Sequence, residues 1–229
     1  MKKLSIAAFI FILILVLPFN LAAQHVGAHI GTSIFTLKNT IQQDGLSFSL
    51  NNKSRVGIAI GAFAEFPLRS KFLFRPELNF IQKGGELNFT DGTDKVETKH
   101  TLNYLEVPLN FYYTTDAGKG KLLLGVGPYF GIGISGKAAS VITLSGQTTS
   151  ASSPIKFDGK NEDQVTDDNV HYKALDYGLT CSGGYRLPGG LSFIAGYQFG
   201  FSNNSPNSSL KLNNRGFNFK IGYLLSQKK

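Results

Sequence analysis

The chain has 229 residues, a formal net charge of +8, and a composition with 26 glycines, 19 phenylalanines, nine tyrosines and no tryptophan. This composition is typical of β structure with many turns. A basic balance can serve nucleic-acid binding, but no cluster of Lys and Arg follows the leader, so we predict no nucleic-acid partner. The single cysteine, Cys181, excludes an internal disulfide, and we expect it to be a small buried hydrophobe on the apolar face of its strand.

The first 23 residues have the pattern of a secretory signal peptide. Two lysines precede an apolar run over residues 6–17, and two alanines precede the predicted cleavage site. The apolar run is shorter than the roughly 20 residues that a membrane-spanning helix needs. We therefore predict that residues 1–23 are removed on export and that residues 24–229 form the mature domain.

The stretch over residues 103–113, NYLEVPLNFYY, has the clearest strand pattern. Its odd positions are apolar or aromatic from Leu105 onwards, and its even positions include Glu106 and Asn110, so side chains of the two kinds point to opposite faces. In a sandwich the apolar face would be the core. In a transmembrane barrel the apolar face meets lipid, and the polar face fills the lumen.

The same alternation recurs in eight segments. They cover residues 25–35, 55–66, 72–89, 103–113, 122–134, 175–187, 191–201 and 217–225. The connections after the second, fourth and sixth segments are short, with the sequences PLRS, TDAGKG and LPGG, whereas the others are longer and polar. Short turns at one end and long loops at the other are typical of outer-membrane barrels. We therefore predict that residues 24–229 form an all-β, transmembrane, antiparallel up-and-down β-barrel of about eight strands, with short periplasmic turns and long outer loops.

Charged residues of the predicted strands test this assignment, because they fall on the face opposite the apolar one. They are Glu65, Arg75, Glu77, Glu106, Asp176, Arg186 and Lys220. A cation on the lipid face at mid-membrane depth would cost about 2 to 4 kcal/mol. Since both signs occur, we predict a structural network of ion pairs in a lumen filled by side chains, without a wide channel.

Aromatic side chains end several of the apolar faces, as the interfacial girdles of a membrane barrel require. They are Phe66, Tyr113, Tyr185, Phe201 and Tyr223. The longest predicted loop, residues 137–172, is rich in Ser, Thr, Asp and Asn. An unstructured loop of that length is usually functional or disordered, so it is the candidate surface for an envelope protein or glycan partner.

Four stretches together resemble the outer-membrane β-barrel family of Bacteroidota that includes PorT-type proteins. They are NYLEVPLNFYY at 103–113, GVGPYFGIG at 125–133, DYGLTCSGGYRL at 176–187 and FIAGYQFGFSN at 193–203. The resemblance spans nearly the whole mature chain and implies an outer-membrane barrel of about eight strands. PorT-type members are linked to type IX secretion and gliding, and no catalytic motif of the family is available to carry over.

Motifs for other chemistry are weak. Gly131, Gly133 and Gly136 match GxGxxG, but no helix pattern follows to hold a pyrophosphate. His25 and His29 share a strand face without a carboxylate or cysteine at ligand spacing, so we predict neither a metal nor a cofactor.

Three functions remain open on the sequence. We predict a non-enzymatic barrel in the outer membrane, in contact with outer-membrane lipid, with the assembly machinery during biogenesis, and with a partner through its outer loops. The alternatives are a narrow porin-like channel and a lipid-modifying barrel enzyme, for which His171 with the serines at 150–153 is the candidate set. A soluble periplasmic β protein would leave large apolar faces exposed to water.

Overall fold

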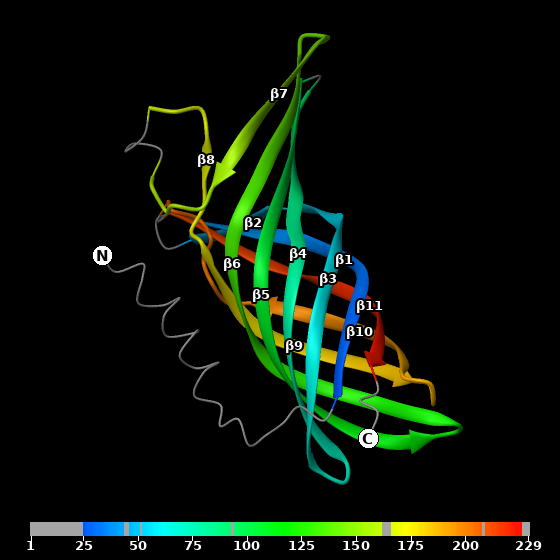
Figure 1. Ribbon diagram of the computed structural model, residues 1–229. Helices are drawn as coiled ribbons and strands as arrows, with labels where there is room; N and C mark the ends of the chain where they lie inside the picture. Colours follow the sequence, from blue (N-terminus) through cyan, green and yellow to red (C-terminus); the bar gives the residue numbers. More distant parts are fainter. Residues whose placement is uncertain are drawn as a thin grey trace.

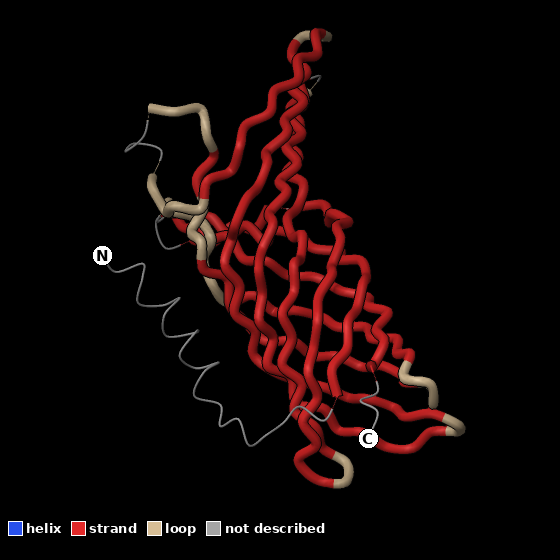
Figure 2. The backbone as a smooth tube through the Cα atoms, viewed as in Figure 1, coloured by secondary structure: helices blue, strands red, loops and turns tan. Residues whose placement is uncertain are grey.

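The computed structural model describes residues 25–43, 46–50, 52–92, 94–161, 166–207 and 209–225, and these form strands joined by turns and short irregular segments (Figures 1 and 2). The predicted signal peptide lies outside the described residues. The strands are β1 (His25–Gln43), β2 (Leu46–Leu50), β3 (Asn52–Arg69), β4 (Phe72–Asp91), β5 (Asp94–Ala117), β6 (Gly120–Leu144), β7 (Gln147–Lys156), β8 (Val170–His171), β9 (Leu175–Arg186), β10 (Leu191–Gly200) and β11 (Leu210–Leu225). Among the described residues, no helix is long and apolar enough to cross a membrane.

Eight of the strands that the structure describes close into a ring. Their order is β5-β4-β3-β1-β11-β10-β9-β6, and β6 pairs with β5 to complete it. Every neighbouring pair of the ring is antiparallel. The turns β3–β4, β5–β6 and β9–β10 are short and lie at one end, which we call the turn end. The predicted fold class, an up-and-down barrel of about eight strands, is confirmed.

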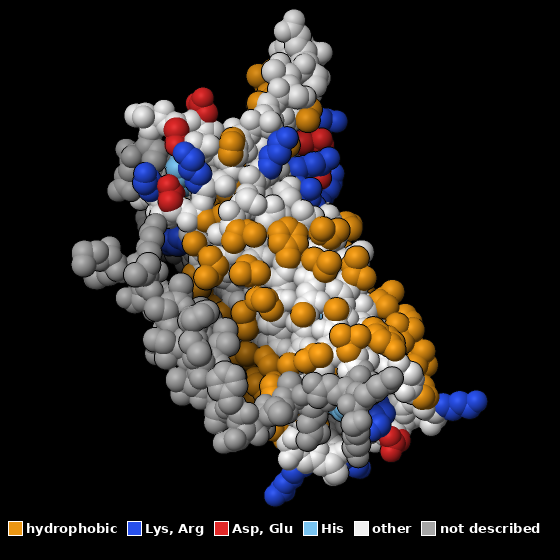
Figure 3. Space-filling view, viewed as in Figure 1, with side chains coloured by type: hydrophobic (Ala, Val, Ile, Leu, Met, Phe, Trp, Pro, Cys, Tyr) orange, Lys and Arg blue, Asp and Glu red, His pale blue; other side chains and the backbone are white. Residues whose placement is uncertain are grey.

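The side-chain alternation has the inverted sense that a membrane requires. Ile30, Val56 and Leu124 point outward with 63%, 64% and 51% of their surface exposed. They belong to an apolar belt to which every ring strand contributes exposed apolar side chains, and Figure 3 shows one face of it. Polar residues between them, such as Asn79 and Glu106, are almost completely buried in the lumen. A one-residue slip in register would reverse both assignments, so the pattern fixes how the strands pair.

At the turn end, aromatic rings meet across neighbouring strands on the outer face. Phe72 and Tyr113 make an edge contact with their centroids 5.4 Å apart, and Phe74 lies 4.9 Å from Phe111. Cross-strand aromatic pairs stabilise sheets, and aromatic rings favour the membrane interface. Of the aromatic residues that the sequence predicts for a girdle, Tyr113 belongs to this group, and Phe66 joins it through Phe74, with the ring centroids 6.2 Å apart.

The predicted unstructured loop over residues 137–172 is wrong. β6 continues to Leu144 and turns back into β7, which pairs with β6 from Gln147 to Ile155. At the opposite end from the turns, β4, β5, β6 and β7 therefore run far beyond the ring as a protruding sheet (Figure 2). Hydroxyl side chains stabilise it, since Thr143 and Thr148 bond across the strands at 3.1 Å. The Ser and Thr residues that suggested a loop are strand residues exposed to solvent on both faces.

Cys181 also differs from expectation. It is free and exposed on the outer face of β9, paired with Val126 of β6 and Tyr197 of β10. The prediction of a buried side chain fails because the apolar face of this fold points to lipid and not to an interior.

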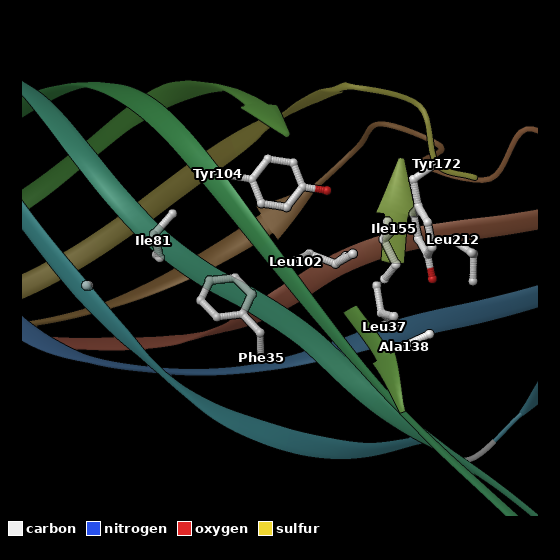
Figure 4. Packing of buried hydrophobic residues seen from close by; sticks show 10 residues of the cluster. Phe35, Leu37, Ile81, Leu102, Tyr104, Ala138, Ile155, Tyr172 and Leu212 are labelled. Atoms are coloured by element: carbon white, nitrogen blue, oxygen red, sulfur yellow. The ribbon is translucent and has the colours of Figure 1, made fainter. Parts of the chain in front are cut away.

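An apolar cluster fills the lumen where the ring meets the protruding sheet (Figure 4). We call it the apolar plug. Its members are Phe35, Leu37, Ala59, Ile81, Leu102, Tyr104, Ala138, Ile155, Tyr172 and Leu212, with Phe157, Val170 and Leu210 packed against it. Most of these come from ring strands, but Ile155, Phe157 and Tyr172 come from β7 and the segment after it. The chain beyond β7 therefore folds back over the end of the barrel.

Candidate functional site

The lumen contains two clusters of charged residues, which inward-facing positions of the ring strands bring together. The turn-side cluster, nearer the turn end, consists of Glu65, Arg75, Glu77, Arg186 and Lys220. The Arg186 guanidinium donates two hydrogen bonds to the Glu65 carboxylate, one of them at 3.0 Å. Lys220 Nζ donates to Glu77 Oε2 at 2.7 Å. Arg75 lies between the two acids, 3.6 Å from Glu65 and 3.2 Å from Glu77, so each carboxylate has two cationic partners.

Aromatic and amide groups hold Arg75 and Glu77 in place. The Arg75 guanidinium carbon lies 3.5 Å from the centroid of the Phe63 ring, a cation–π distance. Asn79 donates to Glu77 Oε2 at 3.1 Å. Arg75 and Glu77 are almost fully buried. No guanidinium nitrogen of Arg75 makes a hydrogen bond among the described residues, so its charge is compensated by the two carboxylates and the face of the Phe63 ring.

The hairpin-side cluster, nearer the protruding sheet, is built around Lys83. Its Nζ lies 2.5 Å from Glu106 Oε2 and 3.0 Å from Asp176 Oδ2, and all three side chains are fully buried. Gln198 donates to Glu106 Oε1 at 2.6 Å, and Ser202 donates to Asp176 Oδ1 at 2.7 Å. Each carboxylate therefore has a cation on one oxygen and a neutral donor on the other.

Three of the ion pairs cross the barrel between strands that are not neighbours in the ring. Glu65 on β3 and Arg186 on β9 stand on diametrically opposite strands of the ring, four places apart in its order. The pairs Glu77–Lys220 and Lys83–Asp176 each join strands three places apart. Such pairs fix the distance between opposite walls. They are braces of the barrel and do not surround a free space.

All seven residues predicted for the lumen network lie in these clusters, together with Lys83, which the alternation puts on the same polar face but which the predicted network did not include. Lys83 is on β4 at the same inward parity as Arg75 and Glu77, so strict alternation from Arg75 identifies it. With Lys83 included, the described lumen holds four acidic and four basic side chains, and its formal charge is zero.

A third charged group lies outside the barrel, where the segment after β7 returns to β8. His171 Nδ1 is 2.8 Å from Asp158 Oδ1, and its Nε2 is 3.0 Å from Asp167 Oδ1. Lys156 also donates to Asp167 at 2.6 Å. An imidazole satisfies two carboxylates only when both nitrogens carry protons, so Asp158 and Asp167 raise the pKa of His171 above its usual value. The pKa of Asp158 is lowered in turn, by its hydrogen bond from His171 against the opposing effect of desolvation.

This geometry bears on the hydrolase candidate, because a general-base histidine needs a free ring nitrogen directed at a nucleophile. Both nitrogens of His171 are occupied by carboxylates. The serines at 150–153 lie on β7, and among the described residues none of them is bonded to His171. The structure therefore does not bring the candidate set together.

The other weak motifs are strand features. Gly131 and Gly133 lie within β6, and Gly133 faces the Phe157 ring so closely that a Cβ would lie 2.2 Å from it. His29 is buried beside Glu77, 3.9 Å away, while His25 lies at the start of β1. Within the described ranges, no group of three or more His, Cys, Asp or Glu residues has the arrangement of a metal site.

Comparison with known proteins gives one family match. The family model described as "Outer membrane protein beta-barrel domain" matches residues 22–205. Among curated proteins, the sequence finds no match.

Several solved structures are similar to the chain. Ail of Yersinia pestis, solved with the heparin analogue sucrose octasulfate, is 14% identical over 87% of this chain and 98% of its own, with a TM-score of 0.33. Neisserial surface protein A is 12% identical over 88% and 97%, with a TM-score of 0.40. OprG of Pseudomonas aeruginosa is 10% identical over 90% and 97%, also with a TM-score of 0.40.

Proposed function

Because the chain belongs to the outer membrane protein beta-barrel domain family, we propose that it is a non-enzymatic outer-membrane barrel whose protruding sheet binds a partner of the cell envelope. The observation that carries the proposal is the contrast between its two polar regions. The charged lumen residues form ion pairs with one another, whereas the protruding sheet carries polar side chains, such as Gln147 and Thr149 of β7, that have no hydrogen bond among the described residues.

The lumen supports a closed barrel in two ways. The cross-barrel ion pairs occupy its centre, and the apolar plug fills the end next to the protruding sheet. A passive channel requires a continuous path of water, which buried ion pairs and packed rings such as Tyr104 and Tyr129 obstruct.

The protruding sheet supports a binding role through the free edge of β7. One side of β7 pairs with β6 from Gln147 to Ile155. On its other side, the described pairings involve only Ile155 and Lys156, which join β8. The backbone groups of residues 147–154 on that side are therefore available to an added strand, as in β-strand addition. This edge carries no charged side chain before Lys156 to block such pairing.

A single labelling experiment tests the exposed position of the edge. In a Cys181→Ser background, Thr149→Cys at the free edge is expected to react with a membrane-impermeant maleimide in intact cells. The matched variant Lys119→Cys, at the β5–β6 turn, is expected to react only after the outer membrane is permeabilised. The opposite labelling pattern would place the turn end outside and overturn the proposal.

The channel alternative is tested by planar-bilayer recording of the purified protein. We expect no discrete conductance steps from the native chain, and reproducible steps would favour the channel. The enzyme alternative predicts that His171→Ala abolishes a lipid modification. We expect the lipid composition to be unchanged, because His171 is held by two carboxylates and serves the fold of the segment after β7.

We extend the proposal to the cellular context of the protein. Residues 1–23 act as a cleaved signal peptide, and the barrel-assembly machinery inserts the mature chain. The resemblance to the family that includes PorT-type proteins, whose most specific part lies within residues 103–113, is the ground for adding a PorT-like role in type IX secretion or gliding to the proposal. A deletion strain that secretes and glides normally would remove that role while leaving the barrel and its binding edge in place.

A further inference from the structure

A series of cations follows the outer border of the apolar belt. On five ring strands, the first charged outward-facing residue beyond the belt, toward the protruding sheet, is basic. These residues are Lys38 on β1 after Ile34, Lys99 on β5 after Leu105, Lys137 on β6 after Ile134, Arg215 on β11 after Phe217, and Arg55 on β3, which follows Val56 directly in the β-bulge between Ser54 and Ala59 and contacts Thr101 of β5 with its guanidinium. We call this set the basic collar, and Figure 3 shows Lys and Arg side chains gathered above the belt.

The collar is densest where β3, β5 and β6 carry Arg55, Lys99 and Lys137, and Lys53 of β3 lies beside it. Lys53 and Lys99 are 67% and 59% exposed, and both approach the same acid, Glu86, at 3.8 and 4.0 Å. One carboxylate at these distances leaves the group with a positive excess. Lys137 lies on β6, the strand next to β5, where it pairs with Thr101. It forms no ion pair among the described residues.

A hydrogen bond to a hydroxyl group on another strand orients the Arg55 side chain. Its guanidinium donates to Thr101 Oγ1 on β5, although β4 lies between the two strands. The residue of β4 that pairs with Thr101 is Gly84, which has no side chain to block the path and a φ of +138° that favours glycine. A single hydroxyl contact leaves most donors of the planar guanidinium free for an anion.

We propose that the basic collar binds the phosphate groups of an acylated glycolipid in the outer leaflet. Two observations select this ligand. The collar is directly continuous with the belt, so a molecule whose acyl chains contact Leu105 and Ile134 places its head group beside Lys99 and Lys137. Its charge excess complements phosphate, the anionic group that lysine and bidentate arginine bind well. A soluble anion would match the charge but would not use the belt.

The test compares lipid binding to the native mature protein and to matched variants in phosphatidylcholine nanodiscs. The probe is diphosphoryl lipid A, with its dephosphorylated form as the lipid control and inorganic phosphate as the free-anion control. Native mass spectrometry counts the bound lipid. Each cation near the surface contributes about fivefold in affinity, so Arg55→Gln/Lys99→Gln/Lys137→Gln is expected to lose roughly a hundredfold.

Matched variants separate the collar from general charge. Arg69→Gln/Lys71→Gln/Lys121→Gln removes three exposed cations at the turn end and is expected to keep native affinity. Arg55→Lys/Lys99→Arg/Lys137→Arg keeps the collar charge and is expected to keep most of the binding. A heat-dependent gel shift in every variant shows that the barrel has folded.

Three results would overturn the proposal. One is equal binding of the phosphorylated and dephosphorylated lipids. Another is a loss in the turn-end variant as large as that in the collar variant. The third is complete displacement of the lipid by inorganic phosphate, which would assign the collar to a soluble anion. Because none of these outcomes depends on a protein partner of β7, the proposal stands or falls separately from the proposed function.

Discussion

The hairpin-side cluster predicts a large loss of stability when Lys83 is replaced by methionine. Lys83 has a fully buried side chain that contacts Glu106 at 2.5 Å and Asp176 at 3.0 Å. Methionine keeps an unbranched side chain of similar length but lacks the ammonium group, which lies 4.2 Å from the centroid of the Tyr129 ring. It leaves two carboxylates in the lumen without their cation. Removing one partner of a buried ion pair costs about 3 to 5 kcal/mol, so we expect Lys83→Met to lower the free energy of unfolding by that amount.

The assay is urea unfolding of the protein in lipid vesicles, followed by the fraction of the heat-modifiable folded band on a gel. Lys53→Met is the matched control, because Lys53 is 67% exposed and lies 3.8 Å from its acid, so it should cost less than about 1 kcal/mol. The triple variant Lys83→Met/Glu106→Gln/Asp176→Asn removes the uncompensated charges and should recover most of the loss. If Lys83→Met costs no more than Lys53→Met, or the triple variant recovers nothing, the bracing role is refuted.

Three further predictions concern the end of the barrel next to the protruding sheet. The His171 imidazole should titrate by NMR with a pKa above its ordinary value of 6.5. The contacts of His171 with Asp158 and Asp167, which we call the His171 clamp, should therefore hold while the imidazole is protonated and weaken as the pH rises through the raised pKa. Asp167→Asn should lower that pKa, and an unchanged pKa would contradict the clamp. Gly133→Leu should displace Phe157 and increase proteolysis near residue 160, whereas Gly183→Ala, whose Cβ has its nearest neighbour at 3.8 Å, should not. Phe157→Ala should leave the ring folded, as the gel shift reports, but make the same segment more sensitive to protease, because Phe157 packs on the plug from outside the ring.

The ring strands could be predicted from the sequence because lipid and lumen impose opposite demands on successive residues. Leu105, Glu106 and Val107 show this within three positions, since the first is 46% exposed to the lipid side and Glu106 is fully buried. The same period places Lys83 in the lumen. Alternation alone puts Lys83 on the polar face with Arg75 and Glu77, but it does not show that Lys83 pairs with Glu106 and Asp176, because those two acids lie on other strands.

The protruding sheet could not be predicted in the same way, because water surrounds both of its faces. Without an apolar side and a polar side, residues such as Thr148 and Ser150 show no alternation, and their hydroxyls read as loop chemistry. β7 is a strand because it pairs with β6 over nine positions, and no pattern in the sequence of β7 identifies β6 as its partner. The return of Tyr172 to the plug depends in turn on where β7 ends.

The clamp of His171 shows a related limit. Asp158 and Asp167 lie 13 and four residues from His171, and these separations match no motif. The three side chains meet because Lys156 and His171 pair in parallel between β7 and β8, which brings the two ends of the intervening segment together. Only the tertiary pairing distinguishes these acids from the other acidic residues of the segment.

The distribution of charge connects the stability of the barrel with its surface. Four acids and four bases cancel in the described lumen, so the formal excess of +8 belongs to the rest of the chain, and two of these charges, Lys2 and Lys3, lie in the predicted signal peptide. An excess inside the lumen would oppose folding, because buried like charges cannot be screened by salt. At the membrane border the same excess costs little and attracts anionic head groups. Composition alone did not identify a partner for the net positive charge of the chain. The basic collar offers one, because its lysines and arginines lie next to lipid and remain in contact with water.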